Sequence, residues 1–413
     1  MDGTKNTPAI RFAGFTDAWE QRKLSTIVDR VTRKNTDLES TLPLTISAQY
    51  GLVDQVTYFN NRVASQNISN YYLVKNGEFA YNKSSSDGYP FGAVKRLDLY
   101  EMGVLSTLYI VFALKDPNVD SNYLACYYDT DNWHKQVSER AAEGARNHGL
   151  LNISAEDFLD TTLMIPQDIR EQTLIGEYLK KLDTLITLHQ RKHEKLISFK
   201  KSCLERLFPR NGSLYPEVRF AGFTDAWEQR KLSSIAEEIT RTDPESTAPV
   251  MMITANNGFI EQSDRYAFNN AGESLKKYIL LEKGEMAYNH GASKLRPYGS
   301  CFALTTTENA RIPFVYHCFS VGENDSEFVS MELNGSRVEN QLRRIVSSGA
   351  RMDGLLNISY EEYSSVELMM PSVSEQHALA SYFRKLDNVI TLHQRELDML
   401  KNLKKSLLQK MFV

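Results

Sequence analysis

The same motif occurs twice in this chain, and this duplication constrains the fold more than any other feature. The segment RFAGFTDAWEQRKLS occupies residues Arg11–Ser25 and recurs unchanged at Arg219–Ser233, 208 positions later. A second pair of segments, LDTLITLHQR at Leu182–Arg191 and LDNVITLHQR at Leu386–Arg395, is 204 positions apart. Because the offset hardly changes, the chain consists of two copies of one module. The stretches between the shared motifs differ, which predicts one scaffold carrying two different surfaces.

Composition and charge are those of a globular chain that is large enough for two domains. Its 413 residues are 42% hydrophobic and 24% charged. The longest apolar stretch, near Gly103–Leu114, is too short to cross a bilayer and predicts a buried strand. The N-terminus lacks the apolar core of a secretory signal and the four cysteines form no CxxC pair, so we expect a cytoplasmic protein without membrane association. A net charge of −4 does not favour a nucleic-acid partner, but a local basic face would suffice.

A long helix is predicted at the end of each copy. Over Glu171–Leu207 and again over Glu375–Met411, apolar residues recur at steps of three and four, as in a heptad seam. Such a helix needs a partner, and the simplest partner is the other helix. Antiparallel pairing would bring together the helix midpoints, His189 and His393, where two neutral imidazoles could share a hydrogen bond. We therefore expect an antiparallel pair that relates the two modules by an approximate two-fold axis.

The rest of each copy predicts short strands separated by turns. Candidate strands in the first copy are Leu42–Ser47, Tyr71–Val74, Glu78–Asn82 and Leu108–Leu114, and each has a counterpart in the second copy. The predicted fold is mixed α/β (α+β), with two similar globular domains separated by the helix pair. The expected parts are globular domains at residues 1–168 and 209–372 and helices at residues 169–208 and 373–413.

The sequence contains none of the motifs that mark the common catalytic sites. It has no Gly-Lys dipeptide and hence no P-loop, and it lacks GxGxxG, HExxH, GxSxG and the Asn-Pro-Pro-Tyr type of motif of amino-methyltransferases. His189 and His193 have the i,i+4 spacing of a helical metal site. The second copy has His393 followed by Leu397, so we interpret these histidines as part of the helix seam. No catalytic, cofactor-binding or metal site is predicted, which is typical of a non-catalytic recognition protein.

The ordered and duplicated motifs resemble the specificity subunit of type I restriction–modification enzymes. They include a Trp-x-x-x-x-Leu segment, a Gly-x-x-Ala-Tyr-Asn strand, and Pro…Glu-Gln…Leu-Asp leading into each helix. A run from Gly-Ala-Arg to Gly-Leu-Leu-Asn-Ile-Ser occupies Gly144–Ser154 and Gly349–Ser359. The tryptophans of the first motif, Trp19 and Trp227, are interpreted as packing anchors rather than as platforms for stacked bases.

This resemblance implies a DNA recognition subunit that is not itself an enzyme. Each globular domain would read one half of a bipartite, asymmetric site in double-stranded DNA, while the helices set the spacer and dock two modification subunits. The modification subunits would bind S-adenosylmethionine, and restriction/translocase subunits would use ATP and Mg, so this chain would hold no cofactor. The alternative is a duplicated protein–protein scaffold without DNA specificity, which would lack the steep salt dependence of DNA binding.

Candidate DNA-contacting residues lie in two loops that occur in both copies but differ in detail. The loop after the Ala-Tyr-Asn strand contributes Asn82, Lys83, Ser84, Ser85 and Tyr89 in the first copy, and Asn289, His290, Lys294 and Arg296 in the second. A second matched loop precedes a glycine and contributes Gln49, Tyr50, Asn256 and Asn257. Amide and guanidinium groups suit base edges and cations suit phosphates, although an ordinary solvated loop would have the same composition.

Further cations are candidates for contacts with phosphates. Arg33 and Lys34 in the first copy and Arg241 in the second follow the Trp segment, and a solvated run of charges is the alternative interpretation. Arg146 and Arg351 belong to the repeated Gly-Ala-Arg. Because these two arginines are the same in both copies, they suit the DNA backbone or the scaffold rather than sequence discrimination.

Overall fold

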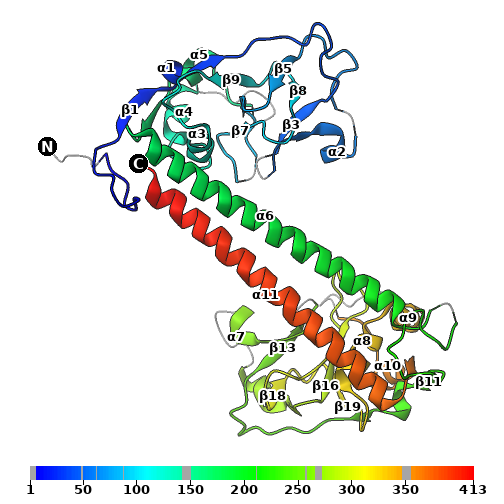
Figure 1. Ribbon diagram of the computed structural model, residues 1–413. Coiled ribbons are helices and arrows are strands. Elements are labelled where there is room, and N and C mark those ends of the chain that lie inside the picture. Colours follow the sequence, from blue (N-terminus) through cyan, green and yellow to red (C-terminus); the bar gives the residue numbers. More distant parts are fainter. Residues whose placement is uncertain are drawn as a thin grey trace. The chain divides into compact units, whose positions relative to one another are not determined.

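A computed structural model describes residues 6–47, 50–61, 63–86, 88–141, 150–210, 212–255, 258–265, 272–346 and 355–413. The fold is mixed α/β, as predicted, and the chain forms two compact units (Figure 1). The first unit contains residues 1–192 and 393–413, and the second contains residues 193–392. Each unit includes part of each long helix, α6 (Ile169–Arg206) and α11 (Val373–Met411). The predicted domain boundaries at residues 168, 208 and 372 stay predictions, because this division falls within the helices.

A four-stranded antiparallel sheet lies at the centre of the first unit. Its strand order is β2 (Val28–Arg30), β9 (Ile110–Leu114), β6 (Phe79–Asn82) and β7 (Ala93–Arg96). Three two-stranded pairs surround it: β3 (Leu44–Ser47) with β4 (Gly51–Asp54), β5 (Tyr72–Lys75) with β8 (Met102–Leu105), and β1 (Glu20–Lys23) with β10 (Thr162–Ile165). The single strand expected near Gly103–Leu114 is wrong, because a turn closed by Tyr109 N–H on Ser106 O (3.2 Å) separates β8 from β9.

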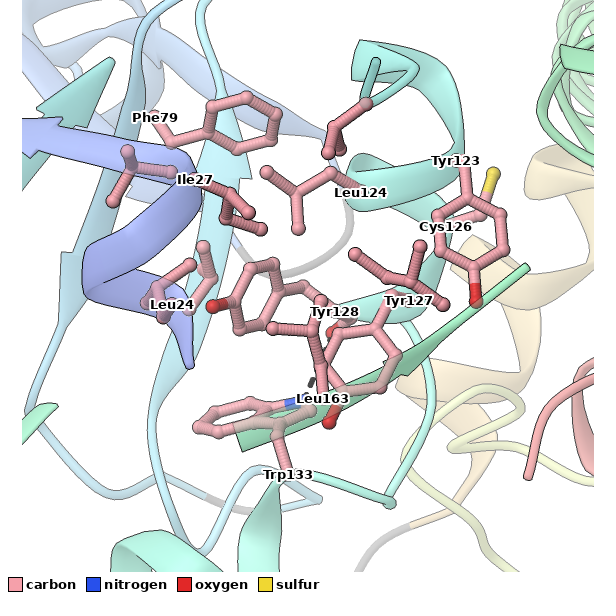
Figure 2. Close-up of a cluster of buried hydrophobic side chains, with 14 of the residues drawn as sticks. Leu24, Ile27, Phe79, Tyr123, Leu124, Cys126, Tyr127, Tyr128, Trp133 and Leu163 are labelled. Atoms are coloured by element: carbon pink, nitrogen blue, oxygen red, sulfur yellow. Dashed lines mark hydrogen bonds between the residues drawn. The ribbon is translucent and has the colours of Figure 1, made fainter. Parts of the chain in front are cut away.

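Short helices connect the strands of the first unit, and all of them except α2 contribute buried side chains. They are α1 (Leu24–Ile27), α2 (Gln55–Phe59), α3 (Ser121–Tyr127), α4 (His134–Arg140) and α5 (Ala155–Leu159). Asp120 starts α3 by accepting a hydrogen bond from the Tyr123 amide, and Ser154 caps α5 in the same way. Figure 2 shows the aromatic core beneath them, in which the indole N–H of Trp133 donates to the carbonyl of Tyr128 (3.3 Å).

The second unit repeats this arrangement. Its four-stranded sheet has the order β12 (Glu237–Glu238), β19 (His317–Ser320), β16 (Met286–Asn289) and β17 (Ser300–Ala303). The pairs are β13 (Met251–Thr254) with β14 (Gly258–Glu261), β15 (Ile279–Glu282) with β18 (Asn309–Ile312), and β11 (Glu228–Lys231) with β20 (Glu367–Met370). Its helices are η1 (Leu232–Ser234), α7 (Gln262–Arg265), η2 (Gly272–Lys277), α8 (Ser326–Leu333), α9 (Ser336–Ile345) and α10 (Tyr360–Ser364).

The repeated motifs have the same structural role in both units. Trp19 and Trp227 are 2% and 1% exposed, so both are packing anchors. At the start of each long helix, a buried glutamate accepts two hydrogen bonds from an arginine of the Trp segment, Glu171 from Arg11 and Glu375 from Arg219. The glutamine that follows each glutamate accepts a backbone N–H and donates to the carbonyl of the preceding proline. These bonds explain why both copies contain Pro…Glu-Gln before the helix.

Within the first unit, α6 and α11 run antiparallel. Lys404 Nζ lies 2.7 Å from the Asp183 carboxylate, and the ring centroids of His189 and His393 are 5.7 Å apart. The residue number therefore rises along α6 as it falls along α11. The predicted proximity of the two histidines is confirmed. Nδ1 of each ring faces the carboxylate of Glu396, and a hydrogen bond between the two imidazoles stays a prediction.

The same antiparallel contact recurs within the second unit. Lys200 Nζ lies 2.6 Å from the Asp387 carboxylate, and Cys203 Sγ lies 3.6 Å from the Tyr382 hydroxyl. Lys200 and Asp387 occupy the repeat positions of Lys404 and Asp183. Each unit therefore contains one copy of the same interhelical ion pair. Across the described ranges, no helix has the length and apolar content that crossing a membrane requires.

Candidate nucleic-acid interface

The Ala-Tyr-Asn strand of each four-stranded sheet, β6 in the first unit and β16 in the second, is called the central strand here. The loop that follows it is anchored by the repeated Leu-Leu-Asn-Ile-Ser motif. In the first unit, the carbonyl of Lys83 accepts the amide of Leu151 (3.0 Å), and the Lys83 ammonium donates to the carbonyl of Ile153 (3.2 Å). In the second unit, the carbonyl of His290 accepts the amide of Leu356 (2.9 Å). Two motifs that are far apart in the sequence thus meet at the base of one loop. This contact fixes where the loop leaves the sheet in both units.

The first asparagine of each loop shapes the backbone of the loop. Asn82 Oδ1 accepts the amide of Ser84 (3.0 Å), and Asn289 Oδ1 accepts the amide of Gly291 (2.9 Å). Asn289 also donates to the carbonyl of Ile253 (3.0 Å). These are turns of the kind that asparagine side chains stabilise. The side-chain oxygens of both asparagines are therefore engaged within the protein.

Beyond these turns, the loops present different side chains to solvent. Ser85 and Tyr89 are exposed in the first unit, and Lys294 is exposed in the second. Arg296 is half-buried and donates to the carbonyl of Asn334 (2.7 Å), and its burial lowers its pKa. Lys294 is thus the loop cation that the second unit presents to solvent, whereas Arg296 connects the loop to α8.

The arginines that follow the Trp segment form ion pairs within their own units. Arg33 lies 2.8 Å from Glu78, and Arg241 lies 2.8 Å from Glu285 at the equivalent position. Lys34 donates to the carbonyl of Asn70 (2.9 Å), and its ammonium is 4.1 Å from the centre of the Tyr72 ring. A protein carboxylate already neutralises both arginines. Contacts of these three cations with phosphates stay predictions.

The β3–β4 hairpin and the helix after it carry an exposed aromatic group in the first unit. Tyr50, before Gly51, is 54% exposed. Tyr58 and Phe59 of α2 are 46% and 48% exposed, with ring centroids 4.9 Å apart. The equivalent helix in the second unit, α7, has the polar sequence Gln-Ser-Asp-Arg. Tyr58 and Phe59 were not among the residues predicted from the sequence, although two adjacent aromatic residues after a hairpin are a usable signal for an exposed apolar surface.

The predicted contact residues Gln49, Arg146, Asn256, Asn257 and Arg351 lie outside the described residues. The predicted residues of the first loop end or follow β6 and β16, and Tyr50 directly precedes β4. Arg33 and Arg241 lie elsewhere, because they pair with Glu78 and Glu285, just before the same two strands begin. Three of the four cysteines are buried, and burial raises the pKa of the Cys126 and Cys301 thiols to about 12. Such thiols stay protonated at neutral pH and are poor nucleophiles. The exposed loop residues present hydrogen-bonding groups, a cation and aromatic rings to solvent, and their contacts with DNA stay predictions.

A known protein family and several solved structures are similar to this chain. Residues 17–197 match a family described as the type I restriction modification DNA specificity domain. A search of curated proteins found no match. The crystal structure of a type I restriction–modification S subunit from M. genitalium has 16% identity and a TM-score of 0.54, covering 98% of this chain and 99% of that chain. This likeness shows that the two proteins share a fold.

Two other solved structures are similar over nearly the whole chain. The HsdS subunit from Thermoanaerobacter tengcongensis has 14% identity and a TM-score of 0.42, covering 97% of this chain and 98% of that chain. A chain from a study of complex assembly and conformational transition in the type I R-M system has 13% identity and a TM-score of 0.46, covering 98% and 99%. The family match covers the first copy, and the second copy carries the same motifs on the same scaffold. The first copy is therefore similar to the type I restriction modification DNA specificity domain, and the second copy repeats its motifs.

Proposed function

We propose that each globular domain of this subunit reads one half of a bipartite, asymmetric site in double-stranded DNA. The observation that carries the proposal is a shared scaffold with different exposed loops. In both units a buried tyrosine of the central strand donates to a loop carbonyl, Tyr81 to Phe91 (2.9 Å) and Tyr288 to Tyr298 (2.7 Å). At the loop itself, Lys83 of the first copy is replaced by His290 in the second. Two different surfaces on one scaffold suit two different half-sites.

The two long helices are proposed to set the spacer and to dock two modification subunits. Leu185 of α6 and Val389 of α11 occupy equivalent positions and are 46% and 41% exposed. The same holds for Leu188 and Leu392, at 56% and 55%. Single exposed apolar residues are common, but a pair repeated at equivalent positions favours two similar partners. One partner would bury Leu185 and Leu188 of α6, and the other would bury Val389 and Leu392 of α11.

In this proposal the chain holds no cofactor and performs no chemistry. The modification subunits would bind S-adenosylmethionine and methylate adenine, and the restriction/translocase subunits would use ATP and Mg to cut unmodified DNA. The subunit would work in the cytoplasm, where these partners meet DNA. Its own contribution would be to hold base-reading loops and docking helices in one chain.

The proposal is tested by mapping methylated adenines in a host with and without this chain. We expect a methylated motif that depends on the chain and contains two short defined stretches separated by an unspecified spacer. The proposal would be contradicted if every methylated motif persists without the chain, or if the motif that disappears is one contiguous stretch. Binding of the complex to a duplex gives a second readout. Its affinity should fall steeply with salt because bound phosphates release counterions, whereas a protein–protein scaffold would show no such dependence.

A further inference from the structure

His189, His393 and Glu396 form a compact group within the first unit. His393 Nδ1 lies 3.0 Å and His189 Nδ1 lies 3.2 Å from the same carboxylate oxygen, Oε2 of Glu396. The potential ligand atoms of the three residues all lie within 4.8 Å of one another. His393 is 9% exposed, and the His189 and Glu396 side chains are 27% and 36% exposed. The group is therefore partly shielded from water but can be reached from it.

The hydrogen bonding of this group is incomplete. His393 Nδ1 has hydrogen-bond geometry with Glu396, whereas His189 Nδ1 is buried and has no hydrogen-bond partner despite its short distance to the carboxylate. Buried polar atoms are nearly always satisfied, so an atom without a partner calls for an explanation such as an ion. A single atom placed among the three residues could bind His189 Nδ1, His393 Nδ1 and the carboxylate together.

We propose that His189, His393 and Glu396 bind a divalent transition-metal ion of the zinc class. Imidazole nitrogens and a carboxylate oxygen are ligands that such ions prefer, with bonds of about 2.0–2.2 Å. Two ligands of a tetrahedral ion with these bond lengths lie about 3.3 Å apart. The observed nitrogen–oxygen distances of 3.0 and 3.2 Å are close to this value. Water would complete the coordination on the exposed side.

The repeat supplies the two imidazoles symmetrically but the carboxylate only once. The residue equivalent to Glu396 in the first copy is Lys192, which is exposed. The group therefore contains two imidazoles and one anion, which suits one divalent cation. The sequence pair His189 and His193 suggests a site on one helix, whereas the structure takes its second imidazole from the other helix. A bound ion would fix the register of these helix segments within the first unit.

The test is binding of zinc chloride to the untagged, chelator-treated full-length chain, measured by titration calorimetry. We expect one high-affinity ion per chain. Because binding to the folded state stabilises it, free zinc at a hundred times the dissociation constant should lower the unfolding equilibrium constant about a hundredfold. His393→Gln and Glu396→Gln should each weaken binding by at least about tenfold. The control His377→Gln removes another imidazole that faces a carboxylate, 2.7 Å from Asp325, and should bind zinc like the original chain.

A second readout keeps the test decisive if a histidine variant folds poorly. Glu396 is not part of the hydrophobic core, so Glu396→Gln should stay folded. Bound cobalt should give the visible absorption of a low-coordinate ion with nitrogen and oxygen ligands in the original chain and lose it in Glu396→Gln. The absence of saturable binding, or equal zinc affinity in the original chain and Glu396→Gln, would overturn the proposal.

Discussion

Replacing Lys404 by methionine should destabilise the first unit far more than the equivalent change destabilises the second. The Lys404 side chain is 17% exposed and lies 2.8 Å from Asp129 and 2.7 Å from Asp183. Burial opposes ionisation of Asp129, but Lys95 and Lys404 outweigh it and lower the pKa of Asp129 to about 2. Relative to an unfolded value of about 3.9, this shift corresponds to about 2–3 kcal/mol of stability at neutral pH, shared between the two lysines.

The loss expected for Lys404→Met is about 2–3 kcal/mol. Removing one partner of a buried ion pair typically costs about 3–5 kcal/mol, and Lys95, which stays 2.6 Å from Asp129, reduces that cost. For a unit of this size, each kcal/mol lowers the melting temperature by about 2–4 °C. Thermal unfolding followed by circular dichroism, together with urea unfolding followed by tryptophan fluorescence, measures the effect.

The repeat provides a matched control in Lys200→Met. Lys200 occupies the equivalent position, but its partner Asp387 is 49% exposed and its own side chain is 32% exposed. A pair this open to water contributes at most about 1 kcal/mol. Equal losses in the two variants, or a loss below about 1 kcal/mol for Lys404→Met, would refute the reasoning. The contribution of Asp129 should persist above pH 4 and disappear as the pH falls towards about 2.

Three further outcomes follow from the structure. Lys294→Ala should weaken DNA binding and reduce the slope of log affinity against log salt concentration by about one. Lys135→Ala, which removes an exposed cation of α4, should change neither quantity. An unchanged slope for Lys294→Ala would remove that residue from the interface. Burial raises the pKa of Glu332 to about 7, so its contribution to the free energy of unfolding is present below about pH 4.5 and is lost as the pH rises through 7. Glu332→Gln should abolish this loss of about 3 kcal/mol. An unaltered pH dependence of urea unfolding in the variant would contradict the assignment. Four residues inserted after Arg191 lengthen α6 by about 6 Å, so methylation mapping should show a spacer about two base pairs longer with unchanged half-sites, and an unchanged spacer would count against the helices as a ruler.

The parts of the fold that depend on local sequence could be predicted. The 3.6-residue periodicity and the prolines placed the helices to within about two residues of their observed starts, Ile169 and Val373. The duplication predicted the antiparallel contact and the approach of His189 to His393. These features are visible because a repeat shows which segments occupy equivalent environments.

Features that depend on contacts between distant residues could not be predicted. The order β2–β9–β6–β7 joins strands that are not adjacent in the sequence, and no single segment encodes such pairing. Arg33 was a phosphate candidate because its partner Glu78 lies 45 positions away. Asn82 and Asn289 were candidate DNA contacts, yet each has a side-chain oxygen engaged in its own loop. Loop residues and their partners come together only when the chain folds.

Exchange of one recognition module tests the central claim most directly. Residues Val28–Met164 would be replaced by the corresponding interior of a related specificity subunit, with the second copy and both helices unchanged. Sequencing of methylated adenines in cells that contain the complete complex would then report the recognised site. The account predicts that one half of the bipartite motif changes while the other half and the spacer stay the same. A motif that changes in both halves, or that does not change at all, would contradict the assignment of one half-site to each domain.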